Sequence, residues 1–148
     1  MVQFEKKRLQ DGTLHITMTG KIDGHFDGAV VLTDVSSAKR VVLHLAGIRS
    51  MSSLGVRQFE DFILKLKGHE VVFIHVPPAV ATQLVMIPGF CSGVRVESAK
   101  LPFVCVACGA ETSHSVPWRP GIASDVAPKC SCGATMELDG NVQQFLPS

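Results

Sequence analysis

The chain has 148 residues, which is enough for one medium-sized domain or for a small domain with an appendage. Its 14 Lys/Arg and 13 Asp/Glu leave a formal net charge of +1, so the chain has no general electrostatic attraction for nucleic acid or an anionic membrane. With 46% hydrophobic and 18% charged residues, the composition excludes a disordered chain and can fill a core. Eight Phe, one Trp and no Tyr provide few aromatic side chains for stacking on unpaired bases.

The first residues, Met1 to Arg8, are charged and contain no apolar run of the kind found in a signal peptide. The stretch from Val71 to Val94 has no Asp, Glu, Lys or Arg over 24 residues, and that length is sufficient to cross a bilayer. Three prolines interrupt it, however, and it is better explained as a strand, a turn and a short helix. We therefore expect no membrane segment and a cytoplasmic location, where thiols stay reduced.

The first elements expected along the chain are two strands, from Phe4 to Leu9 and from Thr13 to Thr19, joined by the turn signal Asp11-Gly12. Apolar residues between Phe26 and Val35 suggest a short helix. The run from Val41 to Leu45 is rich in β-branched residues, as is typical of a strand buried on both faces.

The next elements alternate between helix and strand. Residues Val56, Phe59, Ile63 and Leu66 form one apolar face of a helix that ends at Gly68. A buried strand from Val71 to Val76, a helix from Ala79 to Ile87 with Pro78 in its first turn, and a short strand from Gly93 to Glu97 follow. Strands separated by helices indicate parallel pairing through right-handed crossovers. We expect an α/β fold in which helices cover a mixed β-sheet.

The cysteines and the charge divide the chain near Lys100-Leu101-Pro102. Residues 1–100 carry 12 Lys/Arg and 9 Asp/Glu, whereas residues 101–148 carry 2 and 4. Four of the five cysteines also lie in the second part, which has few long apolar runs. This pattern predicts a first domain over residues 1–100 and a small subdomain over residues 101–148.

The segment from Val41 to Val56 resembles the centre of the STAS domain, a family named for sulfate transporters and anti-sigma factor antagonists. It reads Val-Val-Leu-His-Leu-Ala-Gly-Ile-Arg-Ser-Met-Ser-Ser-Leu-Gly-Val, where the family typically has a buried strand, Leu-Ser-Gly-Val, an apolar residue, Asp-Ser-Ser-Gly and an amphipathic helix. Met18 to Asp23 is similar to the family's Gly-x-Leu-Asp, and Gly68–Val76, Pro78–Ile87 and Gly89-Phe90 follow in the expected order. The resemblance covers residues 3–98 and implies a STAS-like mixed sheet covered by helices.

The chain departs from the family pattern at the serine that anti-sigma factor antagonists phosphorylate. Aligned on Gly55, Leu54 occupies that position, and Ser52 and Ser53 replace the preceding Asp and Ser. Leu54 cannot accept phosphate, which leaves Ser52 and Ser53 as candidates near a helix start. We favour the simpler interpretation that Ser53 caps the helix by accepting a backbone N–H.

Cys105-Val106-Ala107-Cys108-Gly109 and Cys130-Ser131-Cys132-Gly133 have the form of two zinc knuckles, 21 residues apart. Two knuckles separated by a hairpin resemble a zinc ribbon, and four thiolates suit tetrahedral Zn²⁺. The second pair is one residue shorter than the usual Cys-x-x-Cys, and iron is an alternative on ligand type alone. Two unrelated thiol pairs, or a redox dithiol at Cys105 and Cys108, are further alternatives. We expect a structural Zn²⁺, because four protein ligands leave no open coordination position.

Other candidate ligands have simpler explanations. His114 lies between the knuckles and is expected to be a solvated hairpin residue, and Cys91 a small buried hydrophobe. His15, His44 and His75 fall on expected strands as packed or rim residues.

The sequence contains none of the common catalytic motifs: no phosphate loop, nucleophile elbow, dinucleotide fingerprint or His-Glu-x-x-His helix. We therefore do not expect an enzyme. The resemblance implies a bacterial signalling or scaffold protein that binds a protein partner, such as an anti-sigma kinase, through Arg49, Ser50, Leu54 and Gly55. The missing phosphoacceptor favours constitutive binding.

A nucleic-acid-associated zinc-ribbon factor is the alternative, although the net negative charge of residues 101–148 opposes it. A small-ligand site between sheet and helices has no residue in its favour, and homo-oligomerisation through an edge strand stays open.

Overall fold

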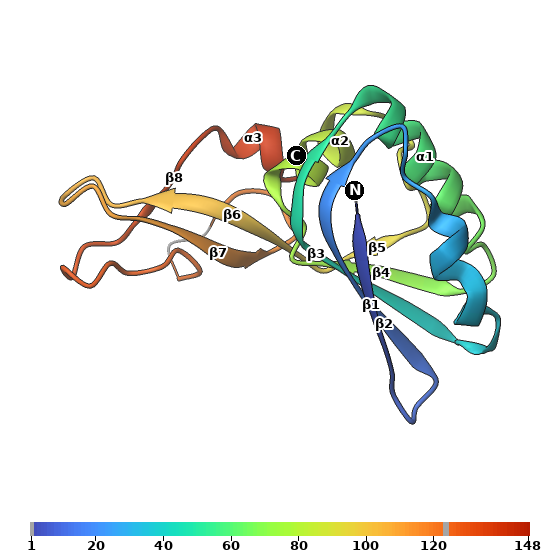
Figure 1. Ribbon diagram of the computed structural model, residues 1–148. Coiled ribbons are helices and arrows are strands. Elements are labelled where there is room, and N and C mark those ends of the chain that lie inside the picture. Colours follow the sequence, from blue (N-terminus) through green and yellow to red (C-terminus); the bar gives the residue numbers. More distant parts are fainter. Residues whose placement is uncertain (1, 123–124) are drawn as a thin grey trace.

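The computed structural model describes residues 2–122 and 125–148, which form two β-sheets with helices beside them (Figure 1). The larger sheet has the strand order β1-β2-β3-β4-β5. β1 (Gln3–Arg8) and β2 (Thr13–Ile22) are the antiparallel pair. The parallel strands that follow β2 are β3 (Arg40–Met51), β4 (Glu70–Ile74) and β5 (Arg95–Val96). The prediction of a mixed sheet in an α/β fold is therefore confirmed.

The helices pack on the apolar face of this sheet. In β2 the side chains of Leu14, Ile16 and Met18 are buried, as the period of two along a strand requires. Helices η1 (Gly28–Ser37), α1 (Ser53–Leu64) and α2 (Pro78–Met86) follow the strands in chain order. Five phenylalanine rings pack together between α1 and the sheet: Phe26, Phe59, Phe62, Phe73 and Phe90.

Three of these elements differ from the sequence prediction. The first helix is a 3₁₀ helix that begins at Gly28, after Asp27 caps it by accepting the Ala29 N–H. β3 continues beyond Leu45 to Met51, so Ser50 lies in a strand. β4 ends at Ile74, because His75 has a φ of 53° and turns the chain out of the sheet.

The smaller sheet lies in the C-terminal part of the chain and has the order β7-β6-β8. β6 (Ser98–Val104) and β7 (Glu111–Pro117) form a hairpin that projects away from the larger sheet (Figure 1). The two-residue strand β8 (Glu137–Leu138) pairs with the far end of β6. The domain boundary predicted near Lys100 falls inside β6.

The two sheets are joined through one hydrophobic core. Val76, just after β4, pairs in a single parallel bridge with Ala99 of β6. The short helix α3 (Val142–Phe145) contacts α2, and Leu146 after it is buried. Buried side chains of both sheets belong to the same cluster, including Leu43, Leu101 and Phe103. Along the described ranges, no helix is long and apolar enough to cross a membrane.

Candidate metal centre

The first cysteine pair lies in the turn between β6 and β7. Cys105 directly follows β6, and its N–H donates to the Ala110 carbonyl at 2.8 Å. The Gly109 N–H donates back to the Cys105 carbonyl at 2.7 Å. Gly109 has a φ of 80°, a conformation that favours glycine and that closes this turn. The hairpin therefore ends at the first knuckle, and does not lie between the two knuckles as the sequence suggested.

The second pair repeats this arrangement with one residue fewer. The Cys130 N–H donates to the Ala134 carbonyl at 2.8 Å, and the Gly133 N–H donates to the Cys130 carbonyl at 2.9 Å. Gly133 has a φ of 95°. Lys129 and Thr135 pair across the base of this turn. The shorter Cys-x-Cys spacing is thus accommodated by a shorter loop with an equivalent pair of hydrogen bonds.

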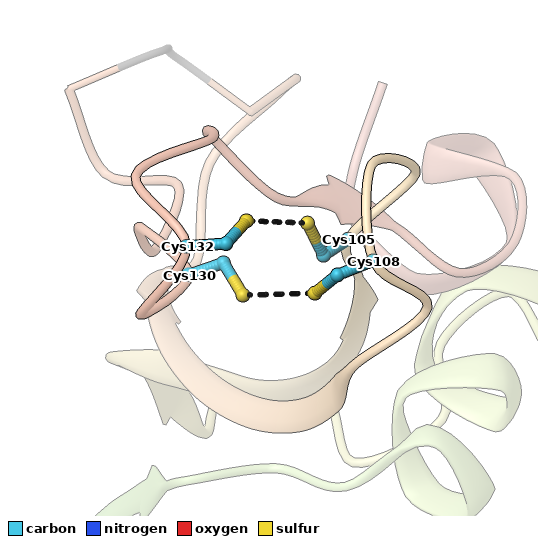
Figure 2. A group of neighbouring side chains, drawn as sticks. All are labelled: Cys105, Cys108, Cys130 and Cys132. Carbon is cyan, nitrogen blue, oxygen red and sulfur yellow. Dashed lines mark hydrogen bonds between the residues drawn. The ribbon is translucent and has the colours of Figure 1, made fainter.

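The four sulfur atoms meet between the two turns (Figure 2). Cys105 Sγ lies 3.6 Å from Cys132 Sγ, Cys108 Sγ lies 3.4 Å from Cys130 Sγ, and all four lie within 4.8 Å of one another. Four thiolates on a tetrahedral ion, with Zn–S bonds of about 2.3 Å, have their sulfurs about 3.8 Å apart. The residues therefore fit a metal ion, and the alternative of two unrelated thiol pairs is wrong.

Hydrogen bonding shifts the pKa values of Cys130 and Cys108 in opposite directions. The pKa of Cys130 falls to about 6, mainly because the Cys132 backbone N–H, and then the Cys108 thiol, donate to its sulfur. The Ala110 N–H lowers the pKa of Cys108, but the Cys130 and Cys105 sulfurs outweigh it and raise that pKa to about 12. The lowered pKa of Cys130 favours its thiolate, the form that binds metals.

The remaining candidate ligands lie apart from this cluster. Cys91 is buried as predicted, and burial raises its pKa to about 12. His114 lies on β7, half-buried, with its ring edge-on to Phe103 at a centroid distance of 6.0 Å.

The residues predicted to bind a partner lie where β3 meets α1. Arg49, Ser50, Ser52, Ser53 and Leu54 are all exposed, and the Leu54 side chain is 61% exposed. The helix cap is Ser52, one residue earlier than predicted: its Oγ accepts the Gly55 N–H at 3.0 Å. The prediction that Ser53 is the cap is wrong, because Ser53 is already the first residue of α1.

Three histidines of the larger sheet lie close together, which the sequence did not indicate. His15 Nδ1 of β2 lies 2.8 Å from His44 Nε2 of β3, and the His44 and His75 rings are 6.5 Å apart. His75 Nδ1 in turn lies 3.0 Å from Ser115 Oγ of β7. Burial, followed by His15 and His75, holds the pKa of His44 below its ordinary value. His15 and His44 both fall on strands that the sequence predicted, but their pairing depends on the register between those strands.

No protein-family model matches the chain, and comparison with curated proteins finds no significant match.

Proposed function

We propose that this protein is a non-catalytic regulatory or scaffold protein with a STAS-like first domain, which binds a protein partner of bacterial signalling. The partner would contact the surface where β3 meets α1, here called the β3–α1 corner: Arg49, Ser50, Ser52, Ser53 and Leu54. Gly55, also predicted to belong to this surface, is buried beneath it. An anti-sigma kinase or a related signalling protein is the class of partner that the resemblance implies.

The exposure of Leu54 is the observation that carries this proposal. A large apolar side chain that is 61% exposed lies beside exposed polar residues, in a corner held firmly by the backbone. The Ser52 N–H donates to the Ile22 carbonyl at 2.9 Å, and its side chain caps α1. A fixed apolar anchor within a polar rim is the usual anatomy of a protein interface.

The same residue favours binding without a phosphorylation switch. Leu54 occupies the position of the phosphorylated serine and has no hydroxyl group. Ser52 uses its side chain as the helix cap, so a phosphate there would replace an existing hydrogen bond. We therefore infer that the partner binds the unmodified chain.

We further infer that the four-cysteine cluster holds a structural zinc ion. Zn²⁺ accepts four thiolates in a tetrahedral site without a redox change. The closed ligand set supplies no position for a substrate, and the ion would hold the far end of β6 against β8. Metal analysis of the purified chain tests this inference: one zinc per chain supports it, and iron in its place contradicts it.

The partner-binding proposal is tested by matched substitutions on α1. Leu54 and Leu64 lie at opposite ends of the helix and are 61% and 62% exposed. We expect a partner to co-purify from the native cells with the wild type and with Leu64→Arg, but not with Leu54→Arg. Native and denatured mass measurements should show a partner of discrete mass and no phosphate on the chain.

Three outcomes would contradict the proposal. Equal recovery of a partner by both variants would place the interface elsewhere. Phosphate on Ser52 or Ser53 would restore a switch mechanism. Recovery of nucleic acid, released steeply as salt rises, would favour the zinc-ribbon factor instead.

A further inference from the structure

Each of the two cysteine turns contributes one buried and one exposed thiol to the cluster. Cys105 and Cys130, the first cysteines of their turns, are 0% and 8% exposed, whereas Cys108 and Cys132 are both exposed. The oxidation of cysteine follows thiolate character and exposure. Cys108 and Cys132 are therefore the two sulfurs of the cluster that a dissolved oxidant reaches.

Each exposed sulfur lies next to the buried sulfur of the other turn. Cys108 Sγ lies 3.4 Å from Cys130 Sγ, and Cys132 Sγ lies 3.6 Å from Cys105 Sγ. Figure 2 shows these two pairs side by side, each joining one turn to the other. A disulfide bond is about 2.05 Å long, so each pair has to close by about 1.5 Å.

This arrangement differs from a redox dithiol within one turn, such as Cys105 with Cys108. Oxidation of a dithiol of that kind leaves the two turns unconnected. The contacts between the turns instead place a buried sulfur of the opposite turn beside each exposed one. Oxidation of these pairs would join the two turns covalently.

We propose that the four cysteines are a reversible oxidation site, at which a hydroperoxide such as hydrogen peroxide links Cys108 to Cys130 and Cys105 to Cys132. The exposed thiolate attacks one peroxide oxygen and breaks the O–O bond, which gives a sulfenic acid and hydroxide. The buried thiolate of the pair then attacks the sulfenic sulfur, forms the S–S bond and expels a second hydroxide. For each disulfide, two electrons pass from the two sulfurs to the peroxide.

Oxidation also removes the ligands of the metal centre. A thiolate is the form of cysteine that binds metals, and the two disulfides together consume all four, so the oxidised chain can no longer hold the ion. This release rests on the structural zinc inferred above, whereas the pairing of the sulfurs does not. Because the disulfides join the same two turns as the ion, we expect β6 and β8 to stay paired in the oxidised protein.

The positions of two lysines make the link between the turns measurable. Trypsin cleaves after Lys100 and after Lys129, which places the first cysteine pair and the second in different peptides. The full-length, zinc-loaded protein is treated with two equivalents of hydrogen peroxide, digested without reduction and analysed by mass spectrometry. We expect the two peptides to be joined by two disulfides, one zinc per chain to pass to a colorimetric chelator, and a dithiol reductant to separate the peptides.

Partial oxidation identifies the partners of each disulfide. After one equivalent of peroxide, alkylation should mark Cys105 together with Cys132, or Cys108 together with Cys130, in the joined peptides. In Cys132→Ser, the link between Cys108 and Cys130 should still form. Cys91→Ala, a change at the cysteine outside the cluster, is the control and should alter neither the links nor the zinc release.

Several results would overturn the proposal. These are disulfides confined to a single peptide, sulfinic or sulfonic acids without a joined peptide, alkylation of Cys105 together with Cys130, and zinc that stays bound after both links form. A chain that purifies without zinc would contradict the zinc inference alone, since joined peptides from that chain would still support the pairing of the sulfurs.

Discussion

At the scale of a single residue, Gly55 allows the start of α1 to lie directly against the end of β2. A Cβ atom at this position would overlap the Ile22 carbonyl oxygen, which also accepts the Ser52 N–H. The corner that exposes Leu54 therefore depends on a residue without a side chain. Helix propensity alone favours Ala over Gly by about 1 kcal/mol, so the tertiary contact opposes the local preference here.

We expect Gly55→Ala to lower the free energy of unfolding by about 1–3 kcal/mol, as overpacking commonly does, and to weaken partner binding. Urea denaturation of the purified protein measures the first effect. Ser53→Ala, an exposed change in the same helical turn, is the control and should remain within about 0.5 kcal/mol of the wild type. A neutral or stabilising Gly55→Ala would show that the backbone of β2 moves to accommodate the methyl group.

The hairpin of β6 and β7 is stabilised differently at its two ends. Near the larger sheet, Ala99 and Leu101 are buried in the common core. At the far end the strands give way to the cysteine turns, where Val106 is 70% exposed. Phe103 and Met136 are buried at this end, and the cysteine cluster joins its two turns.

Loss of one thiol should therefore loosen the far end selectively. We expect Cys108→Ser in the zinc-loaded protein to lose amide-exchange protection in β7 and β8 while β2, β3 and β4 keep theirs, because metal binding contributes folding energy locally. Ser131→Ala, an exposed change between two cysteines, should retain both metal and protection. Unchanged protection of β7 and β8 in Cys108→Ser would mean that packing alone holds these strands.

At the scale of the whole molecule, β6 connects the smaller sheet to the larger one. It contacts β4 and α2, and its Ala99 bridges Val76. Leu101 is fully buried within the shared cluster. The near end of β6 thus belongs to the first core, although the sequence places a boundary at this point.

We expect Leu101→Ala to destabilise the whole protein by about 2–5 kcal/mol, as other buried leucine truncations do. Because both sheets share the core, unfolding should remain a single transition when followed by probes in either sheet. Lys100→Ala, its exposed neighbour, should change stability by less than about 0.5 kcal/mol. Separate transitions for the two sheets would instead support independent domains.

Local patterns predicted most of the elements, and the errors have particular causes. The alternation from Thr13 to Thr19 and the apolar face of α1 identified their elements, because each depends on residues close in sequence. The helix cap was placed one residue late, since Ser52 and Ser53 have equal propensities. The left-handed turn at His75 was missed because no glycine or proline marks that position.

The sequence by itself determined the α/β class, the order of the strands and helices in the first hundred residues, and the four cysteines that could hold a metal ion. Those features follow from short-range periodicity and from ligand spacing, which depend on residues close together in the sequence. Only the tertiary structure decided that β6 crosses the expected boundary, that Gly55 lies against Ile22, and that His15 meets His44. Each of these depends on strand register and packing between segments far apart in the chain, where no local pattern specifies the distance between side chains.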